Sequence, residues 1–306
     1  MERNEEKYDV EKFRAIKDYR LACFMPSFDR IPRNLKWRGG ERVLDIGCGP
    51  GDITKVCIYP ILPQNYEKLV CSDISPEMLE VCKSVFAGIK SVEFLQMDIR
   101  ESPAESLKGT FDRIFSTFCF MYVADQEAAL KNVFDLLAPG GDCWIHQLSR
   151  PSVVLPLFKL AESPKWKDKL QGFRTVQIYP FTEDPNPVAT GEKYMKSVGF
   201  TDISVSIVES HVQMESEEDS LIESLPNPSK DFNEEDKQEL LKDQIAIAKS
   251  LNFFKNNSTS DPKKVPEQFL VMYGLTGASS TAEMRITTEG DQVEDDLLDR
   301  GAKRGQ

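Results

Sequence analysis

The segment Glu41-Arg42-Val43-Leu44-Asp45-Ile46-Gly47-Cys48-Gly49-Pro50-Gly51-Asp52 determines how the rest of the chain is interpreted. Its apolar, β-branched first half predicts a buried strand that ends at Ile46. Glycine then occupies every second position from Gly47 to Gly51, and a helix is expected to begin near Asp52. Alternate glycines let the backbone turn sharply and come close to a ligand, because they carry no Cβ atom. The segment therefore predicts a ligand-binding loop after the first strand of an open α/β sheet.

The spacing of the glycines separates two classes of nucleoside cofactor. A dinucleotide loop needs G-x-G-x-x-G with the last glycine opening the helix, whereas this loop reads G-x-G-x-G and has Asp52 at that position. A carboxylate there would repel a pyrophosphate, and Asp45 before the loop would act in the same direction. S-adenosylmethionine has a sulfonium, an ammonium and a ribose but no phosphate, so acidic groups favour it. A strand-to-helix turn that binds nothing is the alternative.

Composition indicates a globular protein in a reducing compartment. The chain has 306 residues, of which 40% are hydrophobic and 29% charged, as is usual for globular proteins. It has no apolar run of about 18 residues that would span a membrane, and its charged N-terminus lacks the core of a signal peptide. The seven cysteines lie mostly in apolar runs, which predicts buried free thiols in the cytoplasm rather than disulfides or a metal site.

The net charge of −12 is concentrated in two acidic segments, from Glu209 to Asp243 and from Thr276 to the end. No basic stripe is present, which argues against a nucleic acid or an anionic membrane surface as partner. The acidic segments are expected to be solvated faces and a tail. The oligomeric state is not predicted by any pattern in the sequence.

Strands and helices alternate along the first half of the chain. Further strands are predicted at 68–71, 92–97, 111–116 and 142–149, with helices from Ser75 and from Gln126 between them. Ser75 is expected to cap its helix, with Pro76 in the first turn. Such alternation predicts an α/β fold with a doubly wound, mainly parallel sheet.

Three regions surround this core in the expected domain organisation. Residues 1–40 are predicted to form an N-terminal helical cap, 41–275 the main domain with helical inserts at about 151–200 and 210–260, and 276–306 a dispensable disordered tail. Within the second half, strands are predicted at 202–208 and 268–273, and helices near 218–225 and 233–254.

Acidic residues follow the second and third predicted strands. Asp73 comes 22 residues after Gly51, where a doubly wound site binds the ribose hydroxyls; capping of the next helix is the alternative. Asp98 can accept a hydrogen bond from the adenine amino group while the backbone N–H of Ile99 meets a ring nitrogen. A simple turn at the strand end is the alternative for Asp98.

The fourth predicted strand ends beside the glycine loop. Backbone carbonyls at Ser116 and Thr117 are expected to receive the ammonium of the methionine moiety. Cys48 is expected to contribute only its backbone, because no histidine is near it in the sequence.

Together these features resemble class I S-adenosylmethionine-dependent methyltransferases, whose Rossmann-like sheet has seven strands in the order 3-2-1-4-5-7-6. The resemblance implies that S-adenosyl-L-methionine is the cofactor. It implies that Asp45 and the loop Gly47-Cys48-Gly49-Pro50-Gly51 hold the methionine moiety. Asp73, with Ile74 beside it, would hold the ribose, and Asp98-Ile99 the adenine.

A narrower resemblance to the juvenile hormone acid O-methyltransferase family extends over roughly residues 8–275. The family methylates the carboxylate of a terpenoid acid. The matching segments are Lys36-Trp37, Asn65 to Val70, Asp73-Ile74-Ser75, Asp125-Gln126-Glu127, Gly141-Asp142-Cys143, Glu162 to Trp166, Glu183-Asp184-Pro185 and Val198-Gly199-Phe200. Two departures concern the acceptor: residues 12–22 lack the glutamine usual in the family, and Met121-Tyr122 stands where the family tends to have His-Trp.

The predicted acceptor is a small apolar, terpenoid or fatty-acid-like carboxylic acid. Phe118, Met121 and Tyr122 are expected to line its pocket, with Phe120 divided between pocket and core. Tyr19, Arg20 and Tyr122 are the candidate donors to its carboxylate.

A carboxylate is already ionised at pH 7, so no catalytic base is assigned. His146 is interpreted as a strand histidine with satisfied hydrogen bonds, and His211 as structural or exposed. Two other functions were weighed: an NAD(P)-dependent oxidoreductase, which the glycine spacing and Asp52 disfavour, and a non-catalytic protein that binds S-adenosylmethionine or docks a partner.

Overall fold

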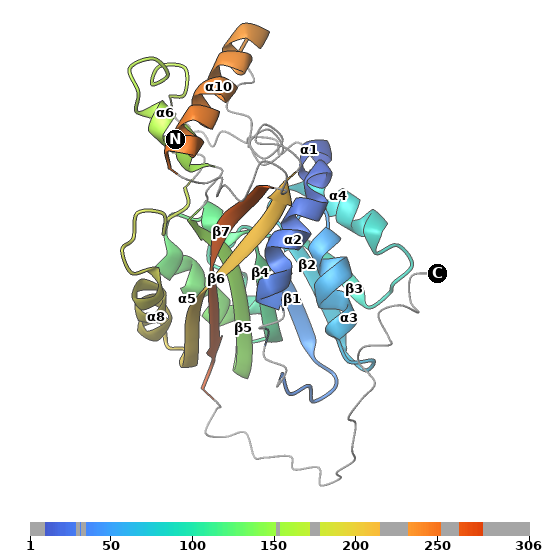
Figure 1. The fold of residues 1–306 in the computed structure, drawn as a ribbon. Helices are drawn as coiled ribbons and strands as arrows, with labels where there is room; N and C mark the ends of the chain where they lie inside the picture. The colour runs from blue at the N-terminus through green and yellow to red at the C-terminus, as the bar shows by residue number, and fades with distance from the viewer. Residues whose placement is uncertain are drawn as a thin grey trace.

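A computed structural model describes residues 10–28, 31, 35–150, 154–171, 178–214, 232–251 and 263–277. Seven strands form one sheet in the order β3-β2-β1-β4-β5-β7-β6 (Figure 1). The strands are β1 Arg42–Ile46, β2 Lys68–Asp73, β3 Val92–Gln96, β4 Phe111–Thr117, β5 Leu137–Arg150, β6 Thr201–Met214 and β7 Lys263–Leu275. The first five are parallel, and β7 runs antiparallel to both of its neighbours. The predicted doubly wound, mainly parallel sheet is confirmed.

Helices cover both faces of the sheet. The α-helices are α1 Val10–Ala15, α2 Lys17–Phe28, α3 Tyr59–Ile61, α4 Pro76–Val85, α5 Gln126–Leu136, α6 Leu155–Ala161, α8 Pro187–Val198 and α10 Glu234–Ser250. Short π or 3-10 segments lie at Thr54–Ile58, Glu105–Leu107 and Phe120–Tyr122. None of the helices in the described ranges is long and apolar enough to cross a bilayer.

Alternate residues of each central strand enter different cores. Val43 and Leu69 pack in a core with α2 and α4, whereas Leu44 and Val70 pack in a core with α5 and α8. This is the consequence of the two-residue period of a strand buried on both faces. Figure 1 shows α5 and α8 together on one side of the sheet and α2 in front of the other.

The start of α4 shows how local sequence fixes the carboxyl edge of the sheet. The Ser75 hydroxyl accepts a hydrogen bond from the Met78 backbone N–H, and Pro76 is the first helical residue. This is the predicted cap, and it fixes the short turn that follows Asp73, the last residue of β2.

β6 and β7 are longer than the predicted 202–208 and 268–273. They pair with each other over almost their whole length, from Thr201 with Leu275 to Met214 with Lys263. The added parts contain the buried polar residues Ser210 and Glu267, which form hydrogen bonds with α2. The apolar run in each sequence therefore marked only part of the buried strand. The helix predicted near 218–225 lies outside the described residues.

The predicted tail does not begin at Thr276. This residue is 6% exposed, and its hydroxyl donates a hydrogen bond to the Ala138 carbonyl at 2.8 Å. Its backbone N–H donates to the Gly141 carbonyl at 2.9 Å. The threonine therefore closes the end of β7 onto β5, and residues 278–306 lie outside the described part.

Candidate functional site

The glycine loop after β1 adopts a conformation that only glycine accommodates easily. Gly47, Gly49 and Gly51 have φ angles of +70°, +55° and +84°. A Cβ atom on Gly47 would lie 2.4 Å from the Cβ of Cys119, and one on Gly51 would lie 2.7 Å from the Sγ of Cys82. Helical structure begins at Asp52 and continues through the π-helical turn Thr54–Ile58, a feature often found at functional sites.

Asp73 links the glycine loop to the start of α4. Its Oδ2 accepts a hydrogen bond from the Gly49 backbone N–H at 2.8 Å, and its Oδ1 accepts one from the Ser75 backbone N–H at 2.9 Å. The carboxyl group is half-buried, and burial raises its pKa. Asp73 therefore stabilises the start of α4, in agreement with the alternative that it caps this helix. It also lies at the loop predicted to bind the cofactor.

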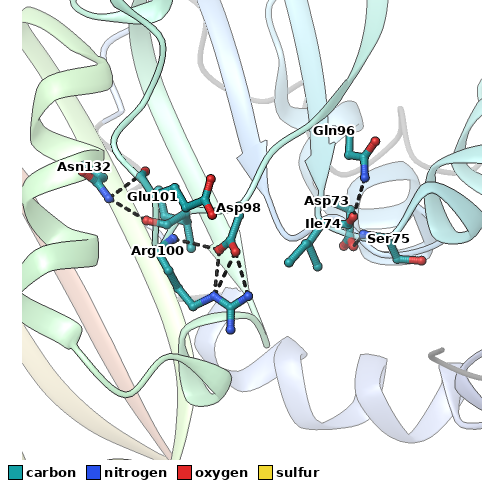
Figure 2. Close-up of polar contacts among 9 residues, drawn as sticks. Asp73, Ile74, Ser75, Gln96, Asp98, Arg100, Glu101 and Asn132 are labelled. Carbon is teal, nitrogen blue, oxygen red and sulfur yellow. Dashed lines mark hydrogen bonds and ion pairs between the residues drawn. The ribbon is translucent and has the colours of Figure 1, made fainter. Parts of the chain in front are cut away.

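Ile74 and Asp98 lie on opposite sides of a gap at the carboxyl edge of the sheet. Figure 2 shows the Ile74 side chain between Asp73 and the pair Asp98–Arg100. Ile74 is 41% exposed, one of three large apolar side chains recorded as exposed among the described residues. Asp98 accepts hydrogen bonds from Arg100 Nε at 2.8 Å and from Arg100 Nη2 at 2.7 Å.

The turn after Asp98 is fixed to α5. The Asn132 side chain donates hydrogen bonds to the carbonyls of Ile99 at 2.7 Å and Glu101 at 3.0 Å (Figure 2). The side chain of Ile99 is buried, so a ligand can reach this residue only through its backbone. Arg100 donates hydrogen bonds to both carboxylate oxygens of Asp98. The adenine amino group would therefore have to compete with Arg100 for this carboxylate.

The end of β4 lies against the glycine loop. The Ser116 hydroxyl donates a hydrogen bond to the Ile46 carbonyl at 2.9 Å, and Thr117 is 6% exposed. The side chains of both residues are thus packed in the sheet, which leaves only their backbone for the predicted role. Phe118 follows with a φ of +57°, a strained conformation that proteins keep mainly at functional sites.

Two acidic residues flank the glycine loop, and their carboxyl groups lie in different environments. Asp45 is fully buried, and burial raises its pKa to about 7. The Thr54 hydroxyl donates a hydrogen bond to Asp45 Oδ2 at 2.6 Å, while Oδ1 has no partner among the described residues. Asp52 forms an ion pair with Arg20 at 3.4 Å. The pair weakens the argument that Asp52 would repel a pyrophosphate, so the case against a dinucleotide rests on the glycine spacing.

The N-terminal helices cover the glycine loop. The Phe13 ring of α1 lies 3.3 Å from the position of a Cβ atom on Gly49, and the Arg20 guanidinium of α2 lies 4.0 Å from the centre of that ring. Sequence analysis assigned Arg20 to the acceptor and did not single out Phe13. No local pattern signals the contact of Phe13 with Gly49 or the pair of Arg20 with Asp52, because each joins residues more than 30 positions apart.

Aromatic and apolar side chains surround the candidate acceptor side of the site. The Met121 carbonyl accepts a hydrogen bond from the Tyr179 backbone N–H at 2.9 Å, and the rings of Tyr122 and Tyr179 are 6.0 Å apart. Phe158 of α6 lies 6.2 Å from Tyr179. Phe120, which the sequence divided between pocket and core, is fully buried in the core with α5 and α8.

The Tyr19 hydroxyl donates a hydrogen bond to Glu267 Oε1 at 3.1 Å. Burial raises the pKa of Tyr19, so this hydroxyl is neutral and already engaged. Tyr19 is therefore the weakest of the three candidate donors to an acceptor carboxylate.

His146 lies in an aromatic cluster at the end of β5. Its ring stacks on Phe269 at 4.5 Å and meets Phe118 at 5.0 Å and Phe24 at 5.1 Å edge-on. Burial lowers its pKa to about 3, so the imidazole is neutral at physiological pH. Neither ring nitrogen has a partner among the described residues, although sequence analysis treated His146 as a histidine with satisfied hydrogen bonds.

All seven cysteines are free thiols, and all but Cys119 are buried. The Sγ of Cys48 lies 3.9 Å from the Sγ of Cys82, beneath the loop, so Cys48 presents its backbone to the other side. Within the described ranges, no group of three or more potential ligand side chains is placed to hold a metal ion.

Comparison with known proteins identifies the domain that carries this loop. A family model described as a methyltransferase domain matches residues 43–141. The juvenile hormone acid O-methyltransferase of Bombyx mori is 32% identical over 186 residues, a match that covers 60% of this chain and 64% of that protein. The match thus spans less than two thirds of that relative.

Solved structures share the fold at low sequence identity. The YcgJ protein of Bacillus subtilis has a TM-score of 0.55 and 16% identity over 83% of this chain and 99% of its own. Phosphoethanolamine N-methyltransferase 2 of Haemonchus contortus, in complex with phosphomonomethylethanolamine and S-adenosylhomocysteine, has a TM-score of 0.52 and 17% identity over 90% and 59% of the two chains. Residues 43–141 thus match a methyltransferase domain, the seven strands from β1 to β7 have the order of the class I methyltransferase fold, and the chain resembles the juvenile hormone acid O-methyltransferases.

Proposed function

We propose that this protein transfers a methyl group from S-adenosyl-L-methionine to the carboxylate of a small apolar acid. The observation that carries the proposal is the glycine loop at the end of β1, with Asp73 hydrogen-bonded to its Gly49 N–H at 2.8 Å. In such a loop, backbone atoms without a neighbouring Cβ and an acidic side chain can contact the same ligand. The match of residues 43–141 to a methyltransferase domain supports the same reaction.

The residues at the carboxyl edge suit the parts of this cofactor. The half-buried Asp73 carboxylate can accept hydrogen bonds from ribose hydroxyls, and the exposed Ile74 side chain offers apolar contact to the adenine. The Oδ1 of Asp45, two residues before the loop, has no hydrogen-bond partner among the described residues. A cation bound nearby, such as the sulfonium or ammonium of the cofactor, would favour the ionised form of this carboxyl group. When bound, the cofactor supplies an electrophilic methyl group on its sulfonium.

In this proposal the protein positions the acceptor beside the cofactor and excludes water from the site, and it supplies no acid or base. An acceptor carboxylate would already be ionised at pH 7, so the chain would need no residue to remove a proton before methyl transfer. His146 cannot serve as a charged donor because burial lowers its pKa to about 3. The aromatic residues Tyr122, Tyr179 and Phe158 would hold an apolar acceptor and keep water out.

Turnover with a mixed panel of acceptors tests this proposal. The full-length protein is incubated with methyl-labelled S-adenosylmethionine and terpenoid acids, fatty acids, amines, a protein extract or RNA, and labelled products are identified by mass spectrometry. We expect base-labile methyl esters from apolar acids only. Methyl transfer confined to amines, protein or RNA would refute the acceptor, and binding of S-adenosylhomocysteine without any turnover would favour a non-catalytic binding protein.

Replacing Asp73 with asparagine is expected to weaken binding of S-adenosylhomocysteine by about 1–3 kcal/mol, because hydrogen bonds to a charged group are lost. The measurement is isothermal titration calorimetry. Ser75→Ala is the matched control: it removes the cap of α4 and should cost about 1 kcal/mol of stability while leaving affinity unchanged. Equal affinity in wild type and a folded Asp73→Asn variant would exclude Asp73 from the site.

A further inference from the structure

Arg20 is a buried cation whose hydrogen bonds are incomplete. The residue is 7% exposed, and its Nη2 donates to the Phe13 carbonyl at 3.0 Å and to Asp52 Oδ2 at 3.4 Å. Its Nε is buried and has no partner among the described residues. Burial lowers the pKa of Arg20 and Asp52 acts in the opposite direction, but an arginine side chain keeps its charge in proteins.

A second buried arginine in the same protein has a shorter, two-point contact with its carboxylate partner, although its Nη1 also has no partner among the described residues. Arg113 binds Asp142 through Nε at 2.6 Å and through Nη2 at 2.7 Å, the two-point geometry that suits a guanidinium and a carboxylate. Arg20 has a single, longer contact with Asp52. A buried charge is costly unless it is paired and hydrogen-bonded. The Arg20 guanidinium therefore has an unused donor in a position where an anion would be stabilising.

The surroundings of Arg20 identify which anion it would meet. Its ion-pair partner Asp52 directly follows the glycine loop, and its guanidinium stacks on Phe13, whose ring lies over Gly49. Arg20 is thus attached to the loop that holds the methionine moiety in the proposed function. That moiety carries one anionic group, the α-carboxylate. Pairing of Arg20 with an acceptor carboxylate would instead withdraw electrons from the oxygen that must attack the methyl group.

We propose that Arg20 binds the α-carboxylate of the cofactor through its Nε–H, with Asp52 holding the guanidinium in place. This inference rests on the proposed cofactor. It reassigns Arg20 from the acceptor, where sequence analysis placed it, to the cofactor. It also gives the N-terminal helices a binding role, because Arg20 belongs to α2, which precedes the matched domain at 43–141.

The test compares two ligands that differ only in the carboxylate. Calorimetry measures the affinity of S-adenosylhomocysteine and of its decarboxylated analogue for the wild type, Arg20→Met, Arg20→Lys and Arg20→Met/Asp52→Asn. The double variant leaves no unpaired buried carboxylate, so it keeps the test valid if Arg20→Met alone fails to fold.

We expect wild type to prefer S-adenosylhomocysteine about 10- to 100-fold, as charge-assisted hydrogen bonds imply. The preference should vanish in Arg20→Met and in the double variant and be partly restored in Arg20→Lys. Persistence of the full preference in the double variant would overturn the assignment. So would unchanged cofactor affinity with a raised KM for the acid, which would place Arg20 at the acceptor. A wild type that binds neither ligand would overturn the cofactor itself, and this inference with it.

Discussion

Gly47→Ala is expected to abolish measurable binding of S-adenosylhomocysteine and to lower the melting temperature of the protein. Gly47 has a φ of +70°, and a Cβ atom there would lie 2.4 Å from the Cβ and 2.5 Å from the Sγ of Cys119. The left-handed conformation costs an alanine roughly 1–2 kcal/mol, and overpacking adds about 1–3 kcal/mol. One of the two close atoms is the Cβ of Cys119, which a change of side-chain rotamer cannot move. The backbone after β4 therefore has to move away from the loop.

Gly88→Ala is the matched control for this variant. Gly88 has a φ of +84°, but no atom lies within 4 Å of the position of its Cβ. It should therefore lose only the conformational term of about 1–2 kcal/mol and keep its cofactor affinity. Adding Cys119→Gly to Gly47→Ala removes both close contacts and should restore part of the binding. If Gly47→Ala and Gly88→Ala have the same cofactor affinity and melting temperature, the glycine loop can accommodate a Cβ atom despite its close contacts.

Contacts near in sequence were accessible to sequence analysis, and contacts across the fold were not. Ser75 with Pro76 predicts the start of α4, and this fixes Asp73 at the end of β2, as the structure confirms. The alternation of strands and helices along the chain predicts the doubly wound, mainly parallel sheet. These features depend on short-range geometry, which a local pattern encodes.

The environment of the candidate site depends on tertiary packing. Arg20 and Asp52 are joined although 32 residues separate them, and no periodicity predicts that pair. Asp98 was expected to be free for adenine, yet Arg100 pairs with both of its oxygens. A signal for that pair was present in the sequence, since an arginine two residues beyond an aspartate in a turn can fold back onto it.

The edge of the sheet was also underestimated from sequence. β6 and β7 continue beyond their apolar segments, where they pair with each other and where the polar residues Ser210 and Glu267 are buried against α2. Thr276 reads as the start of a polar tail, but its hydroxyl and N–H close onto the backbone at Ala138 and Gly141. Composition therefore failed to predict the burial of polar residues whose hydrogen bonds are satisfied by the backbone of a distant strand.

Asp142→Asn is expected to cost about 3–5 kcal/mol in the free energy of unfolding, because it leaves the buried Arg113 charge without its partner. The two side chains are 7% and 9% exposed and form the two-point pair described above. Arg113 and Asp142 are paired in register near the beginning of β4, at the opposite edge of the sheet from the glycine loop. Urea unfolding should therefore show a lower midpoint with an unchanged slope, while the folded variant keeps its affinity for S-adenosylhomocysteine.

Two variants establish that the loss comes from an uncompensated buried charge. Glu192→Gln removes the exposed pair with Lys196, whose side chains are 39% and 64% exposed, and should change stability by only about 0–1 kcal/mol. Arg113→Met/Asp142→Leu removes both charges and should recover most of the stability lost in Asp142→Asn, because apolar replacements of a buried pair are often neutral. A double variant as unstable as Asp142→Asn would instead assign the loss to packing against Trp37, which lies 4.1 Å from the Arg113 guanidinium. Reduced cofactor affinity in the folded Asp142→Asn variant would mean that the two edges of the sheet are coupled.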